Sequence, residues 1–279
     1  MAVTNFIPQI WSARLLAHLD KALVYGNLVN HDYEGEIASV GDTVKINQIG
    51  DITINKRTKG EKLKTEQLDS EQTTLSIDQQ RYFSFSVDDV DAVQANVSLV
   101  DEAMTRAAYG IRDALDRYVA GLYDSAGTQV GTDAAPIAIT SAAKAYENLV
   151  DLKGALDDEN VPSDGRFVVV PSTFYGYLLK DSRFVEAGTQ RTDAVLANGY
   201  IGQAAGFQIY QSNNVPNKDK TGYKVLAGTR AGISFAQQIL KTEAFRAQDD
   251  FADVVRGLVV FGAKVVQPKA LVCLTANFK

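Results

Sequence analysis

Residues 41–87 predict a β-hairpin that is too long to be stabilised by its own chain. In the first arm Val44 and Ile46 alternate with polar residues. In the second arm the apolar positions share one face: Leu75, Ile77, Phe83, Phe85 and Val87. Such alternation is typical of half-buried antiparallel strands. Arms of about fifteen residues would reach about 50 Å, whereas a compact chain of this length has a radius of gyration of about 19 Å. The hairpin is therefore expected to protrude or to lie over another molecule.

The polar tip of this hairpin is the candidate interface between copies of the chain. Its charged residues mix both signs: Lys56, Arg57, Lys59, Glu61, Lys62, Lys64, Glu66 and Asp69. Exposed charge pairs contribute only about 0 to 1 kcal/mol each, so we expect them to select the partner and its register. The apolar faces of the arms are expected to supply most of the free energy of burial.

The composition is that of a globular protein without a net positive charge that would attract nucleic acid. The hydrophobic content of 46% can fill a sizeable core, and the formal net charge of −6 predicts that any DNA contact is local or weak. The single cysteine, Cys273, excludes an intramolecular disulfide and has apolar neighbours typical of a buried residue. Neither a secretory signal nor eighteen consecutive apolar residues occur, which predicts a chain made in a reducing cytoplasm, with no membrane contact.

The rest of the chain predicts an α+β fold. Apolar residues recur at helical spacing after Pro8, over residues 142–156 and, most strongly, over residues 96–123, where a helix would be about 42 Å long. The charged residues of this long helix, Asp116 among them, are expected on solvated faces. Short strands are expected at 166–170, 207–210, 224–227 and 232–235, with a helix at 172–179. The predicted C-terminal strands are 254–255, 258–261, 264–266 and 271–274, returning to pack against the long helix.

No motif for catalysis, a cofactor or a metal stands out. Phosphate-binding glycine motifs are missing, and His18 and His31 are too few to form a metal site with Cys273. The carboxylates Asp88, Asp89 and Asp91 lack the ligand pattern of a calcium loop, and helix capping is the simpler interpretation. The aromatic residues Tyr82, Phe83 and Phe85 are expected in core or interface packing rather than on nucleic-acid bases.

Several segments together resemble a known family. They are FIPQIWSARLL at 6–16, NHDYEGEI at 30–37, GDTVKI at 41–46, FSFSVDDVDAVQ at 83–94, VPSDGRFVVVPSTFYGYLL at 161–179, GFQIYQSNNVP at 206–216 and FADVVRGLVVFGAKVVQPKAL at 251–271. In this order the chain resembles the tailed-bacteriophage major capsid (coat) proteins of the HK97 fold, closest to the branch of P22-like coat proteins. The likeness spans nearly the whole chain, and the order of the segments carries it.

The resemblance implies a domain organisation. It comprises an N-terminal arm at 1–40, an E-loop hairpin at 41–87, a P-domain with a spine helix at 88–127, an A-domain at 128–244 and C-terminal strands of the P-domain at 245–279. The implied function is assembly, in the host cytoplasm, of pentamers and hexamers into an icosahedral shell around a double-stranded DNA phage genome. The implied partners are a separate scaffolding protein and a portal.

Covalent cross-linking between subunits is a property of some family members, which join a lysine of the E-loop to an asparagine of a neighbour. Lysines between Lys56 and Lys64 and the C-terminal Asn277 are the candidates in this sequence, but no motif identifies a pair. A non-covalent shell is therefore expected.

Two other functions fit parts of the sequence. An encapsulin-type compartment would share the fold and enclose enzymes rather than DNA. A cytoplasmic enzyme, with Asp or Ser groups acting in the domain after Gly127, would instead show a deep pocket and carboxylates with shifted pKa values.

Overall fold

The computed structural model describes residues 24–33, 43–49, 54, 70–88, 98–181, 202–218, 222–247 and 252–278. Its helical elements are η1 (Gly26–Leu28), α3 (Ser98–Ala120), η3 (Gly121–Ser125), α4 (Ala142–Asp158), α5 (Ser172–Leu179), η4 (Arg230–Gly232) and η5 (Pro268–Ala270). Its strands are β1 (Thr43–Ile49), β2 (Ser70–Ser76), β3 (Gln79–Asp88), β4 (Thr128–Val130), β5 (Ile137–Ala138), β6 (Phe167–Val170), β7 (Gln203–Ala204), β8 (Phe207–Gln211), β9 (Asn217–Lys218), β10 (Gly222–Gly228), β11 (Ile233–Arg246), β12 (Ala252–Val265) and β13 (Leu271–Asn277).

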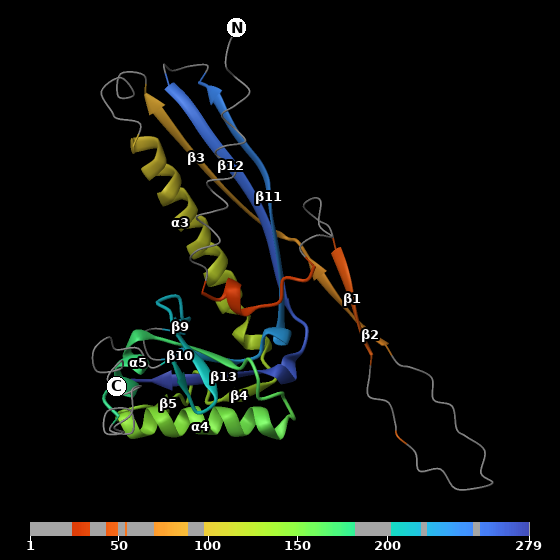
Figure 1. The fold of residues 1–279 in the computed structure, drawn as a ribbon, viewed down its shortest axis with the longest axis vertical. Helices are drawn as coiled ribbons and strands as arrows, with labels where there is room; N and C mark the ends of the chain where they lie inside the picture. The colour runs from red at the N-terminus through yellow and green to blue at the C-terminus, as the bar shows by residue number, and fades with distance from the viewer. Residues whose placement is uncertain are drawn as a thin grey trace, which may run out of the picture.

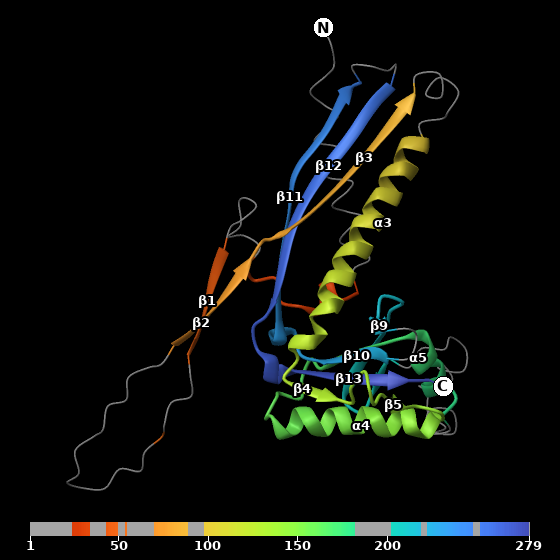
Figure 2. The same cartoon turned by 180° about the vertical axis from the view of Figure 1, so that it is seen from behind.

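These elements form two regions and a projecting hairpin. In one region the long strands β11, β12 and β3 form a sheet with α3 running beside it (Figure 1). In the other region a larger sheet has α4 across the side opposite to α3, and Figure 2 shows the same layering from behind. The hairpin of β1 and β2 leaves the molecule beside the three-stranded sheet. The mixture of helices and sheets confirms the predicted α+β class.

The larger sheet is buried on both faces. Its strand order is β4-β13-β10-β6-β8-β7, with β5 also paired to β13 and β9 to β10. Alternate residues of β6 enter different cores, because successive side chains of a strand point to opposite faces. Phe167 and Val169 pack in the core shared with α3, whereas Val168 and Val170 pack in a second core against α4 and α5.

The helix α4 covers this second core through residues spaced three or four apart. Leu149, Leu152 and Leu156 are fully buried in it. The helix begins at a regular N-cap, where the Ser141 hydroxyl accepts a hydrogen bond from the Lys144 backbone N–H at 3.3 Å. The predicted helices at 142–156 and 172–179 and the strand at 166–170 are confirmed within two residues.

The long helix is confirmed as α3, which ends at Ala120 and continues as the 3-10 turn η3. Its apolar stripe runs along one face: Met104, Ala108, Ile111, Leu115 and Val119. This stripe packs in the same core as Val255, Val259 and Phe261 of β12. The Tyr118 ring meets the Phe261 ring edge-on, with centroids 5.3 Å apart.

The predicted hairpin is confirmed at its root, but its second arm is shorter than predicted. β1 and β2 pair antiparallel from Thr43 opposite Ser76 to Ile49 opposite Ser70. The alternation that continues beyond Ile77 belongs to β3, which pairs with β12 instead. Phe83 and Phe85 pack against the core that contains α3, and this burial draws β3 away from the hairpin.

The C-terminal strands also differ from the prediction. A single strand of 14 residues, β12, replaces the three short strands expected between 254 and 266, because Gly257 and Gly262 do not interrupt it. β13 packs in the core of α3, as expected, but pairs with β10 in the larger sheet. The strand pairings thus cross the predicted boundary at 244/245: β11 lies in the three-stranded sheet and β13 in the larger one.

Candidate functional site

The root of the hairpin packs on the outer face of the three-stranded sheet, the face opposite to α3. Val44, Ile46, Leu75 and Ile77 are buried there, as the alternation predicted, together with residues of the sheet and its surroundings: Ala236, Val260 and Val266. Lys45 and Thr74 lie opposite each other and are exposed. The hairpin therefore uses one apolar face to attach to its own subunit.

A glycine permits this attachment. A Cβ atom on Gly262 of β12 would collide with the backbone carbonyl of Ser76 and would lie 3.0 Å from the Ile77 Cδ1 atom. Backbone atoms cannot rotate away as a flexible side chain can. Gly262 is therefore the position at which the end of β2 reaches the sheet.

Beyond the hairpin root the same outer face of the sheet is exposed. Leu258 lies two residues before Val260 on β12 and pairs with Tyr82 of β3. The Tyr82 side chain is 79% exposed. A groove of about 430 Å³ opens here, lined by Tyr82, Ser84, Glu243, Arg256, Gly257 and Leu258. Large exposed apolar side chains beside a groove are typical of an interaction surface.

An ion pair borders this groove. Both the Nε and Nη2 atoms of Arg256 donate to Glu243 Oε2, at 3.0 and 2.6 Å. The Arg256 guanidinium also lies 4.8 Å from the ring centroid of Phe245, whose side chain is partly exposed. Arg256 therefore contacts both a carboxylate and an aromatic ring at the edge of the groove.

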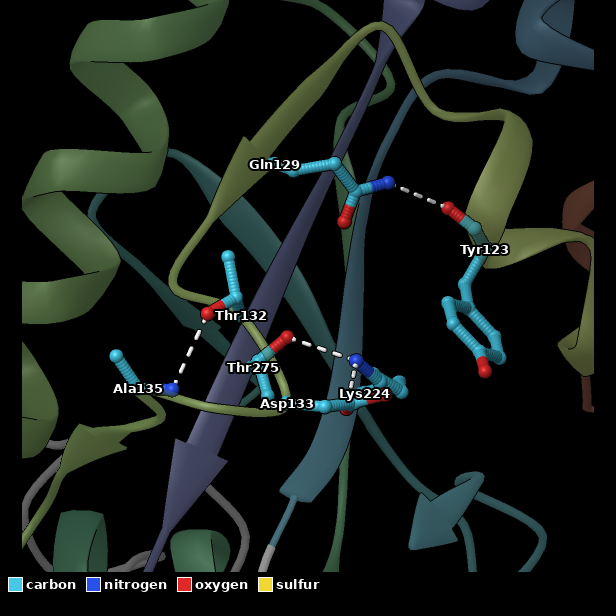
Figure 3. A network of polar contacts seen from close by, with 7 residues as sticks. All are labelled: Tyr123, Gln129, Thr132, Asp133, Ala135, Lys224 and Thr275. Carbon is cyan, nitrogen blue, oxygen red and sulfur yellow. Dashed lines mark hydrogen bonds and ion pairs between the residues drawn. The ribbon is translucent and has the colours of Figure 1, made fainter.

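A second polar cluster lies in the larger sheet (Figure 3). Lys224 of β10 is almost fully buried, and its Nζ atom lies 2.6 Å from Asp133 Oδ1 and 3.0 Å from Thr275 Oγ1. The Tyr123 ring centroid is 5.1 Å from the same Nζ atom. Tyr123 accepts at its backbone carbonyl a hydrogen bond of 2.8 Å from the Gln129 side chain. Asp133 belongs to a turn in which the Ala135 N–H donates to the Thr132 hydroxyl at 3.1 Å. The cluster thus ties the β4–β5 connection to the centre of the sheet.

The other candidate residues from the sequence are the charged residues of the hairpin tip, the two histidines, the carboxylates at and after the end of β3 and the cysteine. All eight charged residues of the hairpin tip lie outside the described part of the chain, as do His18, Asp89 and Asp91. Asp88 is the last residue of β3. Cys273 is fully buried, and burial raises the pKa of its thiol to about 12, as expected of a structural residue. His31 contacts the Gly26 carbonyl oxygen through Nε2 at 2.5 Å.

Sequence reasoning missed two features of these surfaces. Core or interface packing is expected of Tyr82, Phe83 and Phe85 alike, but only Phe83 and Phe85 pack against the core, whereas the Tyr82 side chain lies on the opposite face of β3 and is exposed. Because successive side chains of a strand point to opposite faces, the position of Tyr82 next to Phe83 already places the two side chains on different faces. Asp116 is 3% exposed rather than solvated. Its partners lie far away in sequence, so no local pattern could identify it.

Neither a metal-binding cluster nor a membrane-spanning helix is found in the described ranges. Within these ranges no group of three or more His, Cys, Asp or Glu side chains is placed to hold a metal ion. In the same ranges no helix is long and apolar enough to cross a membrane.

Comparison with known proteins gives consistent matches. Residues 71–274 match the family model of the phage capsid protein. A solved structure from Mycobacterium phage Che8 is 30% identical, with a TM-score of 0.75 and 91% of each chain covered. The capsid structure of cyanophage P-SCSP1u is 16% identical, with a TM-score of 0.75, 93% of this chain and 89% of that chain covered. A virus-like particle from Pyrococcus furiosus, 16% identical, has a TM-score of 0.60 with 95% and 98% covered. No curated protein matched the sequence.

The family match covers more than half of the chain, and the similarity to the Che8 structure extends over nearly all of it. The HK97-like capsid fold accounts for the arrangement of the long helix, the two sheets and the hairpin. The chain belongs to the phage capsid protein family and is a structural major capsid protein, many copies of which build an icosahedral shell.

Proposed function

We propose that this shell encloses a double-stranded DNA phage genome, and that it is built from pentamers and hexamers in which each hairpin reaches a neighbouring copy. The observation that carries the inter-subunit contact is the outer face of the three-stranded sheet. The part of this face around Val260 is covered by the root of the subunit's own hairpin. The part around Tyr82 is exposed beside a groove.

The occupant that suits this groove is apolar with polar flanks. The groove is bordered by the Glu243 and Arg256 ion pair, so an incoming segment meets charge at its edge and apolar surface at its centre. Ile54 is 92% exposed and lies between the arm of β1 and the charged tip. A neighbour's Ile54 would fill the groove while the adjacent Lys56 and Arg57 would face Glu243.

The eight tip residues named above therefore remain the proposed interface between subunits. Charges at the rim of an interface mainly affect partner choice and association rate. Burial of Ile54 and Tyr82 would supply the larger part of the binding free energy, since burying one large apolar side chain contributes about 1.5 to 3 kcal/mol.

The partners of the shell are a scaffolding protein and a portal, and contact with the packaged DNA is weak. The net charge of −6 supports this weak contact, because a strongly basic inner wall would bind phosphate tightly. Assembly takes place in the host cytoplasm. In the domain organisation, β11 and β12 belong with α3 in the P-domain, and β13 contributes to the A-domain sheet.

Deletion of residues 54–70 tests the role of the hairpin. The shortened subunit should fold, because the buried cores described above do not depend on these residues. It should fail to form normal shells in negative-stain micrographs. Circular dichroism of the same preparation provides the control for folding. Normal shells from a folded deletion variant would show that the hairpin is dispensable.

The contents of purified particles separate a virion from an encapsulin-type compartment. Particles recovered from infected cells should contain double-stranded DNA that is protected from nuclease. Particles that hold a specific enzyme and no DNA would contradict the proposed cargo, while leaving the shell itself unaffected.

A further inference from the structure

Three chain connections link the two regions of the subunit, and they meet at one place. In the described part of the chain, the first connection runs from α3 through η3 to β4, the second from β10 through η4 to β11, and the third from β12 through η5 to β13. The third connection contacts both of the others. We call residues 121–128, 228–233 and 265–271 together the junction.

The first and third connections are in direct backbone contact. The Gly127 N–H donates to the Pro268 carbonyl oxygen at 2.8 Å. A Cβ atom on Gly127 would lie 2.7 Å from that oxygen and 2.8 Å from its carbonyl carbon, which is too close for non-bonded atoms. Pro268 stands at the start of η5, and its ring fixes its φ angle, so its backbone has little freedom to make room. Only glycine at position 127 therefore allows this approach.

Backbone hydrogen bonds also join the second connection to the third. The Thr229 N–H donates to the Ala270 carbonyl at 3.2 Å. The Gly232 carbonyl accepts two hydrogen bonds, from the Val266 N–H at 2.9 Å and from the Gln267 N–H at 3.2 Å. The two connections are thus held together at both ends of η4.

The side chain of Leu271 fills the space between these two connections. Leu271 is fully buried in the core that α3 shares with the larger sheet. A Cβ atom on Gly232 would lie 2.6 Å from the Leu271 Cγ atom, and one on Gly228 would collide with the Ala270 carbonyl oxygen and lie 2.7 Å from Leu271 Cδ2. A side chain packed in a core cannot move aside without disturbing its neighbours. The two glycines therefore set how closely the second and third connections approach.

A hinge between two regions works by rotation of a few connecting residues. In this subunit, rotation within one connection would break its hydrogen bonds to another, and it would also part the core that α3 shares with β6, β10 and β13. We propose that the junction is a rigid connection that fixes the angle between the two regions and, through this angle, the curvature of the shell.

The link to curvature follows from the way in which identical copies close into a shell. Unlike contacts between copies give a closed assembly only when the rotation from one copy to the next has the right value. A change of angle within the subunit changes the relative direction of the contacts on its two regions. This inference rests on the shell itself and not on which part of a neighbour each hairpin reaches.

The distance between two spin labels, measured in the full-length, unassembled chain, tests the rigidity. One label is attached at Tyr109→Cys on α3 and the other at Val150→Cys on α4, because both side chains are exposed. The native Cys273 is buried, and mass spectrometry should show two labels per chain. A pair at Tyr109→Cys and Tyr82→Cys, within one region, gives the width that the labels alone produce.

A rigid junction predicts a single distance between the two regions, with a distribution about as narrow as that of the pair within one region. Two separate distances, or a much broader distribution, would overturn the proposal. This measurement needs no substitution in the junction, so it decides even if the variants of the junction do not fold.

Two glycines of the first connection provide a matched pair of variants. A Cβ atom on Gly121 meets no atom within 4 Å, in contrast to one on Gly127. Gly127→Ala should shift the mean distance between the regions by more than the width of the wild-type distribution, and electron micrographs should show incomplete shells or shells of altered diameter. Gly121→Ala should leave both unchanged. Equal distances in the two variants would overturn the rigid junction, and normal shells from a chain with a shifted distance would overturn its link to curvature.

The second connection offers a variant that can be reversed. The nearest atoms to a Cβ on Gly232 all belong to the Leu271 side chain, so Leu271→Ala removes the atoms that it would meet. Gly232→Ala alone should shift the distance between the regions, and Gly232→Ala with Leu271→Ala should return it to the wild-type value. A shifted distance that persists in the double variant would contradict the assigned contact.

Discussion

The backbone carbonyl of Ser76 occupies the position that a Cβ atom on Gly262 would need. This contact joins the end of β2 to the C-terminal part of β12 and so fixes where the hairpin leaves the subunit. Since neither backbone can yield without disturbing its strand pairing, the angle of the hairpin depends on this glycine.

Gly262→Ala should therefore separate the hairpin root from the sheet. We expect a loss of about 1 to 3 kcal/mol in the free energy of unfolding, typical of overpacking, and few closed shells. Urea unfolding of the unassembled subunit and electron microscopy of its products measure the two effects. Gly110→Ala is the matched control, since a Cβ there meets no atom within 4 Å, and it should stabilise α3 by about 1 kcal/mol or less. Equal behaviour of the two variants would contradict the assigned contact.

Tyr82→Ala should weaken assembly without weakening the fold. The side chain is 79% exposed in the subunit, so its removal should change the free energy of unfolding by less than about 0.5 kcal/mol. The concentration needed for shell formation, measured by light scattering, should rise. Tyr109→Ala is the control, because Tyr109 is a 59% exposed tyrosine on α3, away from the groove. A larger assembly defect in the control would assign the interface to the helix instead.

Two substitutions in the Lys224 cluster should lower the free energy of unfolding by unequal amounts. Asp133→Ala leaves a buried ammonium group without its carboxylate and should cost about 1 to 3 kcal/mol, limited by the partial exposure of Asp133. Lys224→Met removes the charge and keeps the volume, so its cost should be smaller. Urea unfolding of both single variants and the double variant measures the coupling between them. A coupling energy below about 0.3 kcal/mol would show that the ion pair does not hold the β4–β5 connection.

Cys273 should be unreactive in the folded subunit. With its pKa raised to about 12, almost none of the thiol is ionised at pH 8, and the side chain is buried. A maleimide should label Cys273 rapidly in urea and very slowly in buffer at the same pH, as followed by mass spectrometry. Rapid labelling of the native subunit would indicate that β13 is not in the centre of the sheet.

Local patterns predicted the helices and the hairpin root well. The spacing of Met104, Ala108, Ile111 and Leu115 identifies α3, and the alternation around Val44 and Leu75 identifies the faces of β1 and β2. Both depend on residues that are neighbours within one element or one hairpin. Periodicity is sufficient for such short-range structure.

Long-range pairing could not be predicted in the same way. Phe83 alternates as a hairpin residue would, but it pairs with Gly257, which is far away in sequence. Asp116 has the spacing of a solvated helical residue, but the backbone N–H of Val24 makes it a buried acceptor. In both cases the decisive partner is contributed by a distant segment, and nothing in the local sequence specifies it.

A cryo-electron microscopy reconstruction of particles assembled from the purified chain tests the central claim most directly. We predict a closed icosahedral shell in which the distal hairpin of each subunit lies in a neighbour's groove beside Tyr82 and Leu258. A hairpin folded back onto its own subunit, or a chain that remains monomeric at high concentration, would contradict it.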